Sequence, residues 1–199
     1  MLDLSDYPKK VRLRKGDEVT IRLLTPGDEA ALIKLMNELL PEDKVYFRDD
    51  VSDPAVVRRW CQNINLNSVL PLVALSGDQI IADWSLHQRE FGWTRHLVDI
   101  RGIVHPAYRQ MGLGAKMVYE LLTIAQRMEK ERAVVHLARA QKKLLARFIA
   151  MGFSVEVVLK NWIKDSSDRY QDMLILSMKI EPIWKEMENM VMESDSRGR

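Results

Sequence analysis

Short segments in which apolar and polar residues alternate mark the strands of this chain. Residues 11–13 and 19–23 alternate on either side of Lys15-Gly16-Asp17, which predicts a hairpin leading into a first core strand. A tight turn at Ser76-Gly77-Asp78-Gln79 separates two further strands. Together with more continuously apolar runs, the predicted strands cover residues 11–13, 19–23, 69–75, 80–86, 97–104, 133–138, 153–159 and 173–180.

Four other segments repeat apolar residues every three or four positions, which is the period of an amphipathic helix. The first follows the capping signal Thr25-Pro26-Gly27-Asp28 and is stopped by Pro41. The last ends at Gly152. The second helix starts at Asp53-Pro54. The third starts directly after a glycine-containing turn that ends at Gly114, and the fourth starts at Gln141.

The order of these elements predicts one α/β (α+β) domain, with a mixed sheet of about six to seven strands flanked by about four helices. Paired strands come first, then strand–helix–strand–helix–strand, and then a last strand. We expect an N-terminal extension with a hairpin strand over residues 1–18, the domain proper over 19–180, and a helical or disordered tail over 181–199.

Composition argues against several functional classes. The net charge of the 199 residues is only +2, from 30 basic and 28 acidic residues, which does not suggest a concentrated basic face for nucleic acid. Cys61 is alone, so no internal disulfide forms, and the four histidines lack metal-ligand spacing. No apolar run approaches the roughly 18 residues of a membrane span. We expect a cytoplasmic protein that uses no metal and binds neither nucleic acid nor membrane.

The most informative segment is Ile103–Gly114, which joins a strand to a helix through a basic turn with two glycines. Glycine lets a ligand approach the backbone, and the first N–H groups of a helix are unpaired at the positive end of its dipole. These features predict an anion site, most often for phosphate. The spacing Arg109-x-x-Gly112-x-Gly114 lacks the lysine and hydroxyl of a nucleotide-triphosphate loop, and the three glycines of a dinucleotide fingerprint.

This spacing resembles the pyrophosphate loop of the GNAT superfamily of acyl-CoA-dependent N-acetyltransferases. The signature of that loop is Arg/Gln-x-x-Gly-x-Gly/Ala, placed after a strand and opening a helix. Val104-x-Pro106 before the loop and Gly152-Phe153 late in the chain fit the same pattern. The resemblance covers about residues 19–180 and implies the GNAT fold, with acetyl-CoA as the acyl donor.

The resemblance also implies a cofactor site along the loop and the strand before it. Backbone amides of residues 110–114 would hold the CoA pyrophosphate. The pantetheine arm would pair with the strand ending at Val104, where this strand splays from residues 134–137. The Val104 amide would face the thioester carbonyl as an oxyanion donor. The implied cofactor-binding residues are Ile103, Val104, Arg109, Gln110, Met111, Gly112, Leu113, Gly114 and, near the place of a common asparagine, Gln141.

Acetyl transfer requires a neutral amine, and a lysine ammonium has an ordinary pKa of about 10.4, so a base must take its proton. Many GNAT enzymes use a glutamate on the strand before the loop. Asp99 occupies that place here, and its shorter side chain favours a water relay. The alternative is that Asp99 pairs with Arg101 or Arg95. Asp83 is a second candidate base. Phe148 stands where many of these enzymes carry the tyrosine that protonates the departing thiolate.

The opening of the chain carries information on the acetyl acceptor. Residues 15–28 and 39–48 are similar to the acetyltransferase domains of bacterial protein lysine acetyltransferases. This similarity slightly favours a protein lysine or N-terminus as the acceptor. An open acidic groove would help to bind such a partner, and it would be formed by Glu42, Asp43, Asp49 and Asp50.

Two alternatives to a protein acceptor stay open at this point. The first is an enzyme for a small amine, such as a polyamine, an amino acid or an aminoglycoside, with a closed pocket. The second, from another class, is a non-catalytic acetyl-CoA sensor or interaction module, which Phe148 and the shortened Asp99 suggest. The partners are then acetyl-CoA and, for an enzyme, an amine acceptor, and a homodimer is compatible with every alternative.

Overall fold

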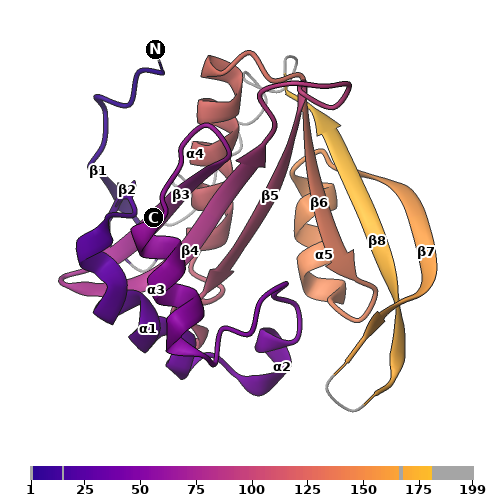
Figure 1. Cartoon of the computed structure of the whole chain (residues 1–199), viewed down its shortest axis with the longest axis horizontal. Coiled ribbons are helices and arrows are strands. Elements are labelled where there is room, and N and C mark those ends of the chain that lie inside the picture. Colours follow the sequence, from indigo (N-terminus) through magenta and orange to yellow (C-terminus); the bar gives the residue numbers. More distant parts are fainter. Residues whose placement is uncertain (1, 15, 166–167, 181–199) are drawn as a thin grey trace.

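The computed structural model describes residues 2–14, 16–165 and 168–180, and the expected tail over 181–199 lies outside them. The described residues form one sheet of eight strands in the order β1-β2-β3-β4-β5-β6-β8-β7 (Figure 1). Neighbouring strands are antiparallel except β5 and β6, which are parallel. The strands are β1 (Lys9–Arg12), β2 (Glu18–Leu23), β3 (Val69–Ser76), β4 (Gln79–Gln88), β5 (Leu97–Val104), β6 (Arg132–Ala138), β7 (Ser154–Lys164) and β8 (Tyr170–Lys179).

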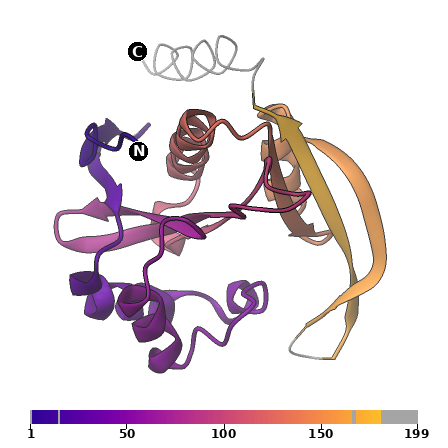
Figure 2. The ribbon, with the colours of Figure 1, turned by 45° about the horizontal axis from the view of Figure 1, so that its top comes forward.

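Five α-helices cover the two faces of this sheet in the described part of the chain. They are α1 (Glu29–Glu38), α2 (Pro41–Lys44), α3 (Pro54–Gln62), α4 (Leu113–Arg127) and α5 (Lys142–Ala150). Figure 2 shows α1 and α3 on one side of the sheet and α4 on the other. Each side has its own core. Leu32, Leu35 and Val57 pack against one face, while Met117 and Phe148 pack against the opposite face.

The parallel pair β5 and β6 forms a fork in the sheet. Their ladder contains only the pairs Leu97–Arg132, Val98–Ala133 and Asp99–Val134. β5 continues to Val104 and β6 to Ala138, but no pairing follows Asp99. The two strands therefore separate toward their carboxyl ends, where β5 enters the glycine turn. This is the splay that the sequence predicted between the strand ending at Val104 and residues 134–137.

The structure follows the predicted elements and corrects some of their boundaries. The sheet has one strand more than expected, because β1 in the N-terminal extension pairs with β2 along residues 9–12 and 18–21. The last two strands are longer than the predicted segments 153–159 and 173–180, because β7 runs to Lys164 and β8 begins at Tyr170. Within the described residues, no helix is both long and apolar enough to cross a membrane.

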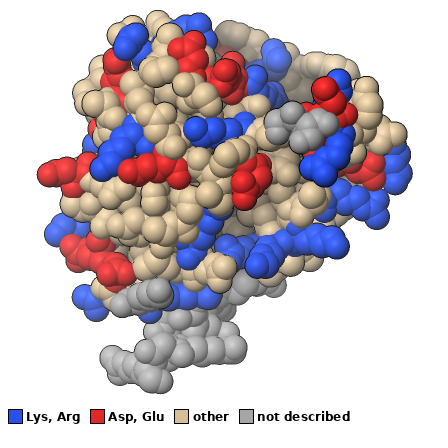
Figure 3. Space-filling view, turned by 90° about the horizontal axis from the view of Figure 1, so that it is seen from below, with Lys and Arg blue, Asp and Glu red and all other residues tan. Residues whose placement is uncertain are grey.

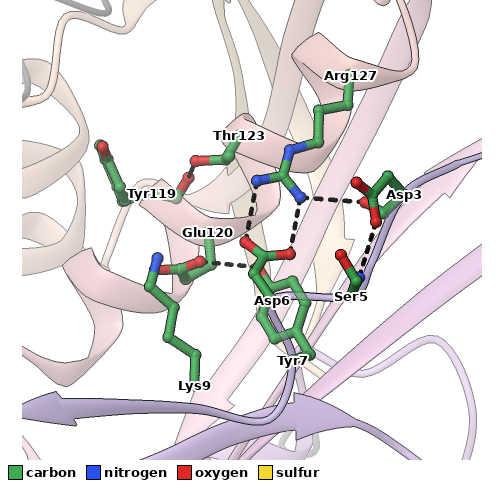
Figure 4. A network of polar contacts seen from close by, with 9 residues as sticks. All are labelled: Asp3, Ser5, Asp6, Tyr7, Lys9, Tyr119, Glu120, Thr123 and Arg127. Atoms are coloured by element: carbon green, nitrogen blue, oxygen red, sulfur yellow. Dashed lines mark hydrogen bonds and ion pairs between the residues drawn. The ribbon is translucent and has the colours of Figure 1, made fainter.

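A buried polar network attaches the N-terminal segment to α4 (Figure 4). Glu120 on α4 is 3% exposed, and it accepts hydrogen bonds from the Tyr7 hydroxyl at 2.7 Å and from Lys9 Nζ at 2.8 Å. About two turns further along α4, the Arg127 guanidinium donates two hydrogen bonds to Asp6, each at 2.9 Å. A buried carboxylate is tolerated only with such partners. The network therefore holds the β1–β2 hairpin beside the helix that follows the glycine turn.

Candidate active site

The glycine turn adopts a conformation that requires glycine at its centre. β5 ends at Val104, a short 3-10 turn spans Pro106–Tyr108, and α4 begins at Leu113. Gly112 has φ +86°, in the left-handed region that costs a residue with a Cβ extra energy. Gln110 also has a positive φ, of 65°. The turn thus exposes the unpaired N–H groups at the start of α4.

A large cavity lies between this turn and the fork of the sheet. Its volume is about 1490 Å³. Of the implied cofactor-binding residues, seven line it and two do not. Met111 and Leu113 are 7% and 1% exposed and pack into the core, so only their backbone can serve a ligand. The seven implied cofactor-binding residues that line the cavity are Ile103, Val104, Arg109, Gln110, Gly112, Gly114 and Gln141.

The backbone of Val104 faces the fork. The next amide, that of His105, donates to the Ile81 carbonyl on β4 at 2.8 Å. Because successive N–H groups of a strand point to opposite sides, the Val104 N–H points away from β4, toward the gap before β6. The Val104 carbonyl accepts a hydrogen bond from Arg109 Nε at 3.0 Å, and the same guanidinium pairs with Asp43 at 2.6 Å. Arg109 thus braces the turn against the end of β5.

Arg14 brings a second positive charge to the turn from the β1–β2 hairpin. Its backbone N–H donates to the Met111 carbonyl at 3.2 Å. A Cβ added to Gly112 would lie 3.6 Å from Arg14 Cγ and 3.7 Å from Nε. The side chain lines the cavity. The sequence pattern does not point to this residue, because a basic segment at the start of the chain is typical of a solvated edge and only the placement of the hairpin brings it beside the turn.

Trp84 on β4 forms part of the wall beneath the turn. Its ring occupies the space where a Cβ of Gly102 would be, 2.0 Å from Cδ2, so only glycine fits at position 102. The indole lies 3.7 Å from the position of a Cβ on Gly114 and is 6% exposed. Among the described residues its N–H has no hydrogen-bond partner. An unsatisfied buried donor at the cavity wall suits a ligand with an acceptor oxygen.

On the other face of the sheet, β4 and β5 place polar side chains opposite one another. The cross-strand pairs are Asp83–Ile103, Ser85–Arg101 and His87–Asp99. Residues that pair directly share one face of the sheet. This face is the one that α1 and α3 cover, because Ile103 packs with their core. The ladder thus forms a polar floor on the side of the sheet opposite α4.

Asp83 is the unpaired carboxyl group of this floor. It lines the cavity, and no hydrogen bond or ion pair to it is found in the described part of the chain. Burial raises the pKa of Asp83 to about 7. A carboxyl group with a pKa near neutrality can accept and release protons during turnover.

Asp99 is tied into a network and does not line the cavity. Its carboxylate accepts from Arg101 Nε at 2.9 Å, lies 3.2 Å from His136 Nδ1, and lies 3.5 Å from a guanidinium nitrogen of Arg48. Burial alone would raise the pKa of Asp99, but the hydrogen bond from His136 and the charge of Arg101 together lower it. The pairing with Arg101 that the sequence left open as an alternative is therefore present.

The two histidines near this network differ in their environment. Burial lowers the pKa of His87 to about 4, and its Nε2 lies 2.9 Å from the Ser85 hydroxyl. His136 lines the cavity from β6, although it lies within an apolar strand that suggested a core histidine. Phe148, in the place of the tyrosine acid, is 3% exposed and packs edge-to-face on Phe153.

Two further predicted features have clear structural counterparts. The Gln141 side-chain oxygen accepts from the Ala138 amide at 2.9 Å, which ties the start of α5 to the end of β6 at the cavity rim. Of the acidic residues expected to form a groove, Asp43 is neutralised by Arg109 and Asp49 lines the cavity. Acidic and basic side chains are interspersed over the face seen in Figure 3. The described residues contain no cluster of three or more metal-ligating side chains.

Comparisons with known proteins agree with this architecture. The family model of the acetyltransferase (GNAT) family matches residues 33–153. The L-methionine sulfoximine/L-methionine sulfone acetyltransferase of Salmonella typhimurium is 25% identical over 142 residues, which cover 69% of this chain and 81% of that protein.

Solved structures share the fold at low identity. The GNAT domain of S. lividans PAT superposes with a TM-score of 0.71 at 17% identity, over 86% of this chain and 96% of that one. The structure of yncA from Salmonella typhimurium with its cofactor acetyl-CoA has a TM-score of 0.69 at 21% identity, over 82% and 95% of the two chains.

The forked sheet and the glycine turn at the entrance of α4 agree with the arrangement that the resemblance to the GNAT superfamily implied. The family match extends over more than half of the sequence. The chain belongs to the GNAT family of acetyltransferases. It is an acetyl-CoA-dependent N-acetyltransferase, the enzyme class among the alternatives that the sequence left open.

Proposed function

We propose that this enzyme transfers the acetyl group of acetyl-CoA to the amine of a small molecule, with Asp83 as the base. The observation that carries the proposal is the unpaired Asp83 carboxyl group on the cavity floor, whose pKa burial raises to about 7. The residue pairs with Ile103 across the β4–β5 ladder, one position before Val104. The base on β4 therefore lies opposite the residue that precedes Val104 at the end of β5.

The donor binds along the turn and the fork. The N–H groups of residues 110–114 hold the pyrophosphate, with the guanidinium of Arg14 nearby. The pantetheine arm follows the free edge of β5 to Val104, where the amide stabilises the charge that develops on the thioester oxygen. Gln141 contributes to the rim on the α5 side.

The acetyl transfer then follows from two groups, the Asp83 carboxylate on β4 and the Val104 amide at the end of β5. The amine nitrogen attacks the thioester carbon, and the Asp83 carboxylate takes the proton that the nitrogen loses, directly or through water. The oxyanion forms opposite the Val104 N–H and collapses as the carbon–sulfur bond breaks. The products are an N-acetyl amine and CoA. Asp99, paired with Arg101, keeps its charge in this scheme and does not take the proton.

The depth of the cavity, and the residues of α1, α3 and the segment before α3 that line it, favour a small acceptor. It reaches Leu24, which is 5% exposed, and Leu32 on α1, which is 0% exposed. Phe47 and Trp60, with ring centroids 6.5 Å apart and nearly parallel, line it from the segment before α3 and from α3 itself. Pairing of Asp43 with Arg109 weakens the acidic groove that a basic protein partner would use. The curated relative that acts on methionine sulfoximine and sulfone supports the same acceptor class.

The test is a CoA-release assay in which wild-type enzyme and acetyl-CoA meet two acceptor sets under the same conditions. One set contains L-methionine sulfone, amino acids, polyamines and aminoglycosides, and the other contains lysine and N-terminal peptides. We expect saturable CoA release with a member of the first set and background rates with peptides. Saturable release with peptides alone would replace the small-amine assignment by a protein acceptor, which the sequence slightly favoured.

A further inference from the structure

A carboxylate–imidazole pair stands at the fork between β5 and β6. Asp99 belongs to the last residue pair of the ladder, opposite Val134. His136 lies two residues beyond Val134 on β6, on the same face and past the point where pairing ends. Its Nδ1 is 3.2 Å from Asp99 Oδ1. His136 lines the cavity while Asp99 does not, so the carboxylate lies behind the ring.

This contact determines which nitrogen of the ring faces the ligand. An ionised carboxylate only accepts hydrogen bonds, so Nδ1 carries the hydrogen that Asp99 receives. The guanidinium of Arg101 and the more distant Arg48 keep the Asp99 carboxylate charged. Nε2 of His136 is then the nitrogen left for the cavity. A histidine fixed by a carboxylate in this way is a well-suited proton donor when its ring is charged.

Breakage of the carbon–sulfur bond creates a thiolate that needs a proton, and the cavity offers few groups for this step. A thiol has an ordinary pKa of about 8.5. Phe148 carries no proton to give, and burial lowers the pKa of His87 to about 4, so His87 is neutral at neutral pH. Tyr46, Tyr108 and Tyr119 also line the cavity, and Tyr108, which follows the end of β5, is the competing donor that the experiment tests.

We propose that His136 protonates the sulfur of CoA as the acetyl group is transferred, and that Asp99 is the positioning residue for its ring. This inference rests on the proposed function. The amine nitrogen forms the bond to the acetyl carbon and gives its proton to Asp83. The electron pair of the carbon–sulfur bond goes to sulfur, which takes the proton from Nε2 of His136. The neutral imidazole then takes up a proton from water, and Asp83 gives its proton back to water.

The charged and titratable groups around His136 are known from each neighbouring strand and loop. β5 contributes Asp99 and Arg101, and the loop after α2 contributes Arg48. On β4, His87 pairs with Asp99 across the ladder. On β8, the residue paired with His136 is the apolar Ile175.

The experiment compares His136→Asn with the wild type and with His96→Gln, a control outside the cavity. Asparagine keeps a donor toward Asp99 but has no proton to transfer. We expect kcat to fall about 100-fold, with L-methionine sulfone or the best amine of the acceptor panel, while the Kd for acetyl-CoA from calorimetry changes less than twofold. The acidic limb of the pH–kcat profile, which belongs to Asp83, should remain in His136→Asn. His96→Gln should match the wild type.

A double-mutant cycle with Asp99→Asn separates positioning from direct catalysis. If Asp99 acts through His136, Asp99→Asn lowers kcat in the wild type and has little further effect in His136→Asn. Unchanged kcat in His136→Asn, additive losses in the double variant, or a 100-fold loss in Tyr108→Phe alone would each overturn the proposal. A wild type that releases no CoA with any amine would instead overturn the proposed function.

Discussion

Replacing Asp83 with asparagine removes a proton acceptor and keeps the size of the side chain. Loss of a general base lowers kcat by about 100- to 10,000-fold. In the wild type, only the carboxylate form of Asp83 is active as a base, and its pKa is about 7. The rate should therefore rise with pH, reaching half of its plateau near pH 7 and about a tenth near pH 6. Asp83→Asn should lack this limb.

The same raised pKa predicts an effect on stability in the opposite direction. The folded state holds the Asp83 proton more tightly than the unfolded state, so wild-type stability falls as pH rises from about 4 to 7. A pKa raised from about 4 to about 7 lowers the free energy of unfolding by about 4 kcal/mol at pH 8 and by about 1.5 kcal/mol at pH 5. Both figures are upper limits, because the carboxyl group faces a cavity that water can enter. Asp83→Asn should recover part of this free energy.

Urea unfolding at pH 5 and pH 8, together with kcat over the same range, measures both effects. Asp99→Asn is the matched control for the stability measurement alone, because the pKa of Asp99 is lowered and its carboxylate is paired with Arg101. That variant should lose stability at neutral pH, since the contribution of a lowered carboxyl pKa is present above the unfolded value and is lost as pH falls. An Asp83→Asn enzyme with wild-type kcat and an unchanged acidic limb would refute the assignment of the base.

Three further variants test the walls of the donor site. Gly112→Asp should weaken acetyl-CoA binding at least 100-fold in calorimetry, because the new carboxylate and the pyrophosphate are both negative. Two like charges about 5 Å apart cost about 3 kcal/mol near a protein surface. Equal affinity in Gly112→Asn and Gly112→Asp would contradict this. Arg14→Gln should weaken binding about threefold to tenfold at low salt, whereas Arg12→Gln, outside the cavity, should bind as the wild type does. Gly102→Ala should displace the Trp84 ring and lower the free energy of unfolding by about 3 kcal/mol, and an unchanged urea midpoint would count against that packing.

Sequence patterns predicted the fold and the donor loop because both depend on local rules. Alternation located the strands, and the spacing of Gly112 and Gly114 located the turn whose left-handed φ at Gly112 needs glycine. The end of β7 and the start of β8 were wrong by several residues, because this part of the chain is largely polar, yet Ile163 pairs with Gln171 and Lys164 pairs with Tyr170 in the hairpin. Such pairing depends on the partner strand more than on intrinsic preference.

The chemistry of the carboxyl groups could not be predicted in the same way. Asp83 and Asp99 have similar surroundings in the sequence, and their pKa values move in opposite directions because Arg101 and His136 reach only Asp99. Contacts between β5 and β6 join residues 37 positions apart. For the same reason His136 looked like a core residue, and Arg14 like a solvated one. These assignments require the placement of the fork and of the hairpin.

The most direct test of the account is a crystal structure of the enzyme with acetyl-CoA. We predict the pyrophosphate on the N–H groups of residues 110–114, the thioester oxygen opposite the Val104 amide, and the sulfur at the fork on the side of His136. A pyrophosphate bound away from the turn, or a thioester outside the fork, would contradict the central claim that this turn and fork form the acetyl-donor site.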